Sequence, residues 1–146
     1  AMQGYSSAED WINDRIQKLT QYTDRAIVVR PHPRSSIQPH LIKGAVQIQY
    51  PNKIANTYDS FDFDTDYHAV INYNSGPGIQ AALAGTRPIV DVSSLAWPVS
   101  STIENIESPY DVNRDQWLVE ICHTEYTLSE IKKGTWLPRI QPALIL

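Results

Sequence analysis

The sequence has almost no cysteine: Cys122 is the only one in 146 residues. A single cysteine excludes an intrachain disulfide framework and a cysteine-based zinc cluster. Long apolar runs are missing too, since none approaches the roughly 20 residues that cross a bilayer. The beginning, AMQGYSSAEDW, lacks the basic and then apolar order of a signal peptide. We therefore expect a cytoplasmic protein with no membrane span, in which Cys122 is a small buried apolar residue.

An excess of basic residues is also missing. The net charge of −4 gives no electrostatic footprint for tight nucleic-acid binding by this segment. The chain is 42% hydrophobic and 19% charged, and its ten prolines and four tryptophans are typical of a folded, loop-rich protein. With 146 residues and no internal repeat, it has the length of one domain. We expect a single domain over residues 1–146.

Helical and strand patterns alternate along the chain. Residues 7–22 carry apolar side chains at helical spacing, and residues 25–30 form a short β-branched run that Pro31 closes. A weaker strand pattern lies near residues 45–49. Residues 67–73, 77–84 and 87–92 then read as strand, short helix and strand. This order predicts an α/β fold with a mostly parallel sheet and helices on its faces.

The C-terminal third has helical patterns. They cover residues 102–106, 113–122 and 127–133. Thr127 and Glu130 form a capping-box pattern at the start of the last helix, and Gly134 supplies its stop. We expect this third to be helical and to pack back on the sheet through its tryptophans.

Two loops that follow predicted strands carry chemistry suited to anions. The first, RPHPR, contains Arg30, His32 and Arg34, and arginine can donate two parallel hydrogen bonds to a phosphate. The alternative is that His32 bonds a nearby carbonyl while the arginines are solvated. In the second, NSGPG, Asn74, Ser75 and Gly76 precede a helix whose free N–H groups and dipole favour an anion. The alternative there is ordinary helix capping, and the motif is neither a P-loop nor a dinucleotide fingerprint.

A third loop after a strand holds Asp91, Ser93 and Ser94. Their carboxylate and hydroxyl groups suit ribose or sugar hydroxyls, and the alternative makes them turn residues with Trp97 in the core. The acidic residues of segment 59–66 lack the glycine and terminal Glu of an EF-hand, so we interpret that segment as a solvated loop. We expect no bound metal and no cofactor.

A family resemblance covers most of residues 11–134. It is carried by the three loops and by the stretches SSLAWPV and RDQWLVEICHTEYTLSEIKKG. The sequence resembles the C-terminal half of GT-B-type glycosyltransferase-like proteins, a group common in bacteriophages and their marine relatives. The plan of His-Pro and then Ser motifs is similar to that of capsule sugar transferases and of sialyltransferases that use CMP-activated sugars. The resemblance implies a Rossmann-like, three-layer domain, the one of two such domains that holds the nucleotide-sugar donor.

By that resemblance, Arg30, His32, Asn74, Ser75 and Gly76 contact the donor phosphate, while Ser93 and Ser94 contact the nucleoside or sugar. The acceptor, a glycan or a modified DNA base, would bind in a missing N-terminal domain or a partner chain. We expect a donor-binding half with little transferase activity alone and assign no catalytic residue. The alternative is a non-catalytic nucleotide-binding or assembly module, for which the apolar tail 137–146 offers a surface for a partner or a second copy. A phage origin would place it in the host cytoplasm.

Overall fold

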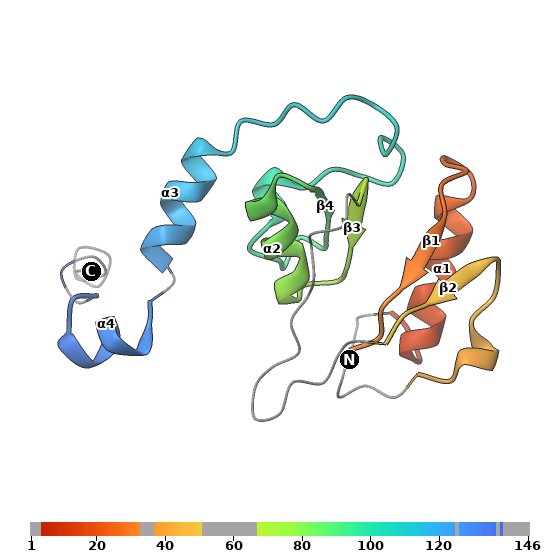
Figure 1. Cartoon of the computed structure of the whole chain (residues 1–146), viewed down its shortest axis with the longest axis horizontal. Coiled ribbons are helices and arrows are strands. Elements are labelled where there is room, and N and C mark those ends of the chain that lie inside the picture. Colours follow the sequence, from red (N-terminus) through yellow and green to blue (C-terminus); the bar gives the residue numbers. More distant parts are fainter. Residues whose placement is uncertain (1–3, 33–36, 51–66, 125, 137, 139–146) are drawn as a thin grey trace. The chain divides into compact units, whose positions relative to one another are not determined.

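The computed structural model describes residues 4–32, 37–50, 67–124, 126–136 and 138. The chain divides into two compact units, Ala1–Tyr110 and Asp111–Leu146. The four strands lie in the first unit (Figure 1). The single domain expected over residues 1–146 stays a prediction.

The first unit is mixed α/β with short parallel strand pairs. Its elements are α1 (Ala8–Leu19), β1 (Ile27–Val29), η1 (Pro39–Leu41), β2 (Val46–Ile48), β3 (Ala69–Ile71), α2 (Gly76–Ala84), β4 (Arg87–Ile89) and η2 (Trp97–Val99). β1 pairs with β2 from Ile27↔Val46 onward, and β3 pairs with β4 from Ala69↔Arg87 onward. Both pairs are parallel, as predicted, and among the described residues no ladder joins the two pairs.

The helix ends follow the local sequence. Ser7 caps α1, since its hydroxyl accepts a hydrogen bond from the Asp10 N–H at 3.0 Å. α2 begins with proline in its first turn, where the missing N–H breaks no helical bond. It ends at Gly85, whose φ of 89° is a left-handed conformation that glycine adopts without strain. α1 thus ends three residues before the predicted residue 22, and α2 begins one residue before the predicted residue 77 and ends at residue 84 as predicted.

One face of the β3–β4 pair covers a small apolar core. Leu19 from α1 meets Ile89 from β4, together with Ile103 and Ile106 from the segment after η2. Ile27, Ala69 and Ile71 pack against the same cluster. Because side chains alternate along a strand, Val70 and Asn72 point to the opposite face.

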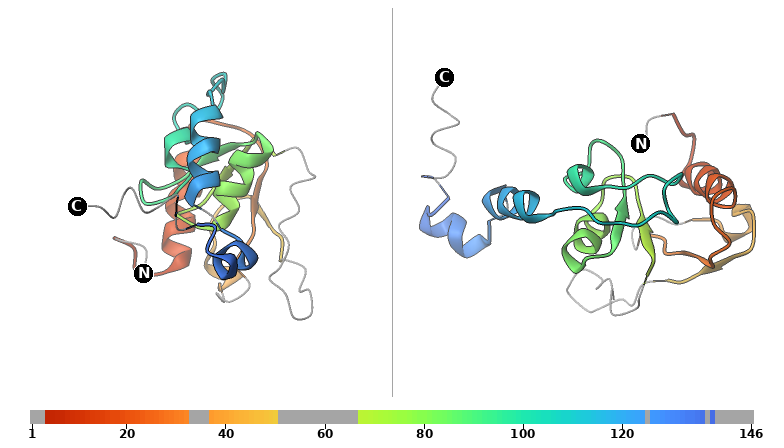
Figure 2. Two further views of the ribbon diagram at one scale, coloured as in Figure 1. Left: turned by 90° about the vertical axis from the view of Figure 1, so that its left-hand side faces the viewer. Right: turned by 90° about the horizontal axis from the view of Figure 1, so that it is seen from above.

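α2 covers that opposite face, as Figures 1 and 2 show. Gly78, Ala81 and Ala82 are buried on it, and these small residues let the helix approach the strands closely. A Cβ at Gly78 would lie 2.7 Å from Val90 Cγ1 and 2.8 Å from Asn72 Nδ2, closer than real Cβ atoms come. The helix therefore sits where only glycine fits at residue 78.

The segment 102–106 forms turns, so the predicted helix there is wrong. The buried guanidinium of Arg87 explains this, because it takes the backbone carbonyls that a continuing helix would use. It donates to Asn105 O at 2.6 Å and to the carbonyls of Ile106 and Ser108. Its charge also lies 5.2 Å from the ring centre of Tyr110.

Glu107 ties the same turn to the loop between α1 and β1. Arg25 donates to both oxygens of Glu107, at 2.8 and 3.1 Å, and the Thr23 hydroxyl donates at 2.5 Å. The hydrogen bonds from Arg25, and then from Thr23, lower the pKa of Glu107 to about 2. A ring nitrogen of His68 also contacts Ile106 O, at 2.7 Å.

The second unit contains α3 (Asp115–Thr124) and α4 (Leu128–Lys133). The predicted capping box is confirmed, because the Thr127 side chain accepts from the Glu130 N–H while the Glu130 carboxylate accepts from the Thr127 N–H. Gly134 ends α4 with a φ of 69°. Cys122 is exposed, which corrects the expectation that it is buried. Packing of this unit on the sheet stays a prediction.

Candidate functional site

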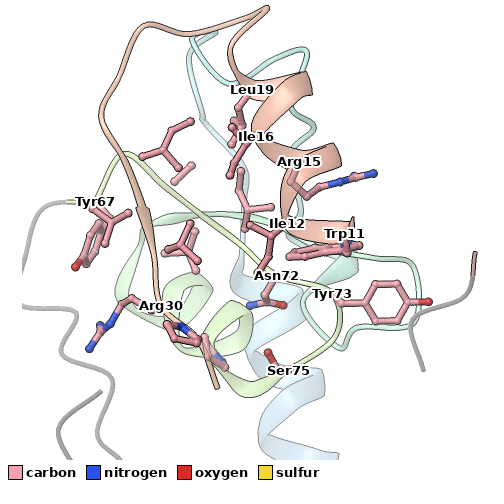
Figure 3. Close-up of a pocket in the computed structure, with 18 of the residues that line it drawn as sticks. Trp11, Ile12, Arg15, Ile16, Leu19, Arg30, Tyr67, Asn72, Tyr73 and Ser75 are labelled. Atoms are coloured by element: carbon pink, nitrogen blue, oxygen red, sulfur yellow. The ribbon is translucent and has the colours of Figure 1, made fainter. Parts of the chain in front are cut away.

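The first unit holds a cavity of about 540 Å³. Its walls come from α1, from β1 and the residues after it, and from β3 and the residues that lead into α2 (Figure 3). Most of the surface is apolar, with side chains such as Ile12, Val28 and Val70. Polar groups line it after β1 and β3, and also on α1 and before β1 and β3, where Arg15, Arg25 and His68 lie. Apolar walls with a few polar groups are the usual composition of a small-molecule site.

The loop after β1 contributes Arg30 and His32 to the wall. Pro31 between them is buried, whereas His32 is exposed. The Nε atom of Arg30 is also buried, so part of this guanidinium lies inside the structure. The Arg30 backbone directly follows the end of β1. Arg34, the third cation predicted for this loop, lies outside the described residues.

α1 holds the chain that returns from this loop. Glu9 is only 8% exposed, and its carboxylate accepts from the Gln38 N–H at 2.7 Å. That backbone hydrogen bond is the main reason why the pKa of Glu9 is lowered. One turn later, Asn13 donates to Leu41 O at 2.9 Å and accepts from the Lys43 N–H at 2.8 Å. The two side chains thus fix residues 38–43 against the helix.

The loop after β3 brings Asn74 and Ser75 to the same cavity. Ser75 is the N-cap residue of α2, yet its hydroxyl makes no capping hydrogen bond. The simple capping alternative for Ser75 is therefore not what the geometry shows, and the hydroxyl is exposed. Gly76, the first helical residue, is exposed as well and is not part of the cavity wall.

The loop after β4 lies outside the cavity wall. Asp91 accepts from the Ser93 N–H at 3.0 Å and from its hydroxyl at 2.8 Å, and these bonds, the backbone one first, lower the pKa of Asp91. Ser94 is buried and its hydroxyl accepts from the Ala96 N–H at 3.2 Å. These contacts are those of turn residues. Trp97 is 47% exposed, so it does not lie in the core, where the alternative placed it.

A side-chain and a backbone hydrogen bond link the second and third loops, the latter from the Asp91 N–H to Tyr73 O at 2.8 Å. The side-chain amide of Asn74 donates to the Ser93 hydroxyl at 3.3 Å. The structure therefore brings Arg30, His32, Asn74 and Ser75 to one cavity and leaves Asp91, Ser93 and Ser94 beside it. The binding roles of all these residues stay predictions.

Two wall residues were not expected from the sequence. Trp11 of α1 contributes an aromatic face, with the Arg15 guanidinium 5.9 Å from its ring centre. Asn72, just after β3, lies in the wall with its carboxamide drawn among the labelled side chains of Figure 3. The sequence signal for Asn72 was available, because it is the first polar residue after an apolar strand, at the edge where ligands bind.

No protein-family model, curated protein or solved structure matches the chain. Within the described residues, no group of three or more His, Cys, Asp or Glu side chains could hold a metal ion. The helices in the described part of the chain are all too short or too polar to span a bilayer.

Proposed function

We propose that the first unit binds a nucleotide sugar as the donor-binding half of a GT-B-type glycosyltransferase. The observation that carries the proposal is that loops after two different strands line one cavity: Arg30 and His32 from the first, and Asn74 and Ser75, 42 to 45 residues further along, from the second. A cationic loop together with the amide of Asn74 and the hydroxyl of Ser75 at one cavity suits a phosphorylated ligand.

The dimensions and chemistry of the cavity agree with such a ligand. Its volume of about 540 Å³ lies within the range of small-molecule sites. Apolar walls suit the ring systems of a nucleotide sugar, and the polar groups at the strand ends suit its phosphates. The proposed architecture is a Rossmann-like, three-layer domain in which β1 and β3 flank the switch point of a parallel sheet, where such folds bind nucleotides.

Glycosyl transfer builds negative charge on the departing nucleotide phosphate. Guanidinium, imidazole and backbone N–H donors held in place before the reaction lower the barrier by stabilising that charge. The acceptor, a glycan or a modified base of phage DNA, would be bound by an N-terminal domain or a partner chain. This division of labour predicts little transferase activity for the chain alone.

A non-catalytic nucleotide-binding or assembly module is the second candidate. The observation in its favour is the second unit, where α3 and α4 expose Val119, Leu128 and Ile131, with Leu128 75% exposed. Exposed apolar side chains at helical spacing are typical of a surface that associates with another protein or a second copy. Hydrolysis or transfer of a bound donor in the presence of an acceptor domain would distinguish the transferase from the module.

A thermal-shift panel tests the proposal. The chain is heated with UDP, CMP and GDP and with their sugars, each at millimolar concentration. We expect one nucleotide series to raise the melting temperature, and His32→Ala and Ser75→Ala to remove that rise, because both side chains line the cavity. Asp91→Asn is the matched control, since Asp91 is bonded within its own turn. No stabilisation across the panel would refute the donor site.

A further inference from the structure

The indole of Trp11 lies in the cavity wall and not in the core cluster. That cluster is built from Leu19, Ile89, Ile103 and Ile106. Trp11 is half-buried and lines the cavity from α1. Small-molecule sites are lined mainly by hydrophobic and aromatic side chains, so an indole in such a wall is a surface that a ligand can contact.

A network of side chains holds a guanidinium over this indole. The Arg15 guanidinium lies 5.9 Å from the ring centre of Trp11. Arg15 donates to the Asp14 carboxylate and to the Tyr5 hydroxyl, each at 3.0 Å, and the Tyr5 hydroxyl donates to Asp14 at 2.9 Å. Because the three groups form a closed triangle of hydrogen bonds, Arg15 is held in its place beside the ring.

The other side of the indole is open to the cavity. Within the described residues, Arg15 is the only side chain that makes a cation–π or ring contact with Trp11. In Figure 3 Arg15 is drawn on one side of the Trp11 ring, and Asn72 and Ser75 are drawn on the other. All four residues line the cavity. A flat group that enters the cavity can therefore stack on the ring without displacing the guanidinium.

Trp11 is at the end of the cavity where β1 and β3 end. In the first turn of α1, the Glu9 carboxylate binds the Gln38 N–H, in the segment that follows the loop after β1. The last turn of α1 belongs instead to the core cluster with Ile106, whose carbonyl contacts His68 just before β3. α1 thus runs opposite to these strands, and Trp11 is near the loops that line the cavity after them.

We propose that Trp11 stacks on the nucleobase of the bound nucleotide sugar. This inference rests on the proposed function and names the part of the cavity that takes the base. The family resemblance implies Ser93 and Ser94 as contacts of the nucleoside or sugar, but both lie outside the cavity wall, whereas Trp11 lies in it.

Stacking on an aromatic side chain suits a nucleobase, because every base has a flat π-face. Ribose and phosphate offer no such face. The hydrogen bonds around Arg15 position the platform before the ligand arrives, so binding loses less side-chain entropy. Trp11 is then a specificity residue that separates nucleotides from simple sugar phosphates.

Nucleoside monophosphates and ribose 5-phosphate test the assignment, because they share ribose and phosphate and differ in the base. Calorimetric titration at pH 8 compares UMP, CMP, GMP and AMP with ribose 5-phosphate. We expect one nucleotide or more to bind about tenfold more tightly than ribose 5-phosphate, the contribution of stacking one base on an aromatic side chain. Trp11→Leu should lose this preference, and Trp11→Phe should keep most of it. Trp97→Leu is the matched control, because Trp97 is exposed and lies outside the cavity wall.

The indole N–H resonance of Trp11 reports the stacking directly in the unaltered chain. It is assigned as the indole signal that is absent from Trp11→Phe. We expect the nucleotide that binds most tightly to shift this signal more than those of the other tryptophans, while ribose 5-phosphate leaves it in place. A purely structural Trp11 would not respond to the base in this way. An unmoved Trp11 signal at saturating nucleotide, or a base preference that survives Trp11→Leu, would overturn the inference.

The outcomes separate this inference from the proposed function. If a nucleotide sugar stabilises the chain through His32 and Ser75 while the Trp11 signal does not move, only the role of Trp11 is refuted. If a monophosphate moves the Trp11 signal but no nucleotide sugar binds, the donor function is refuted and a nucleotide site at Trp11 stands. If none of these ligands binds, both are refuted.

Discussion

Replacement of Gly78 by alanine tests the close contact between α2 and the strands. The new Cβ would lie 2.7 Å from Val90 Cγ1, where ordinary contact begins at 3.4 Å, so the helix or the strand must shift by about 0.7 Å. Overpacking of this kind costs about 1–3 kcal/mol. The higher helix propensity of alanine offsets up to about 1 kcal/mol of that cost.

Gly76→Ala is the matched control, because it lies in the same helical turn and its Cβ would meet nothing within 4 Å. We expect Gly78→Ala to lower the free energy of unfolding by about 1–3 kcal/mol relative to Gly76→Ala, because the gain in helix propensity is common to both variants and only the overpacking differs. Urea unfolding followed by circular dichroism measures the difference. Equal stability of the two variants would refute the close approach of α2 to the strands.

Three further substitutions test other contacts. Arg87→Leu removes the guanidinium that donates to three backbone carbonyls, although Asn105 O keeps the Ser108 N–H and Ile106 O keeps its contact with His68. We expect a loss of about 3 kcal/mol in urea unfolding, with Arg87→Lys recovering little because it lacks the fork; a loss below about 1 kcal/mol would contradict the role of Arg87 in holding the turn. Glu107 has its pKa lowered to about 2 in the folded state, mainly by Arg25, from an ordinary 4.5. It therefore stabilises the fold above pH 4.5, and this contribution is lost as the pH falls from about 4.5 to about 2. Thermal melts of Glu107→Gln should show a weaker dependence on pH over that interval, and an unchanged dependence would argue against the ion pair. Thr127→Ala breaks the capping box and should destabilise α4 by about 1 kcal/mol, seen as faster amide exchange at Glu130, while equal exchange rates would show that the box contributes nothing.

Local patterns predicted the elements well where the local sequence decides the outcome. The caps at Ser7 and Thr127 and the stops at Gly85 and Gly134 depend on the chemistry of a few adjacent residues. The parallel pairing of the strands follows from helices and strands in alternation, which leaves few topologies. These features are readable without tertiary information.

Long-range contacts decided the features that the sequence did not reveal. The helical pattern at residues 102–106 gave way to turns because Arg87, in a distant strand, binds their carbonyls. Neighbouring residues could not reveal that contact. For Asn72, the position after an apolar strand was visible in the sequence, whereas its packing against Gly78 of α2 was not.

The sequence likewise predicted only part of the cavity wall. That Arg30 and Ser75 follow strands was visible in the sequence, and the structure brings both to one cavity. Asp91 and Ser93 also follow a strand, but they bond to each other within a turn. Whether a polar residue after a strand faces a cavity depends on its loop geometry, which pattern alone does not specify.

The binding location is the most direct test of the donor site. Backbone amide resonances of the ¹⁵N-labelled chain are recorded while the nucleotide sugar that gives the largest thermal shift is added. We predict that the largest changes fall on Arg30, His32 and the residues from Asn72 to Gly78. Changes centred on the second unit, or none at saturating ligand, would contradict the account.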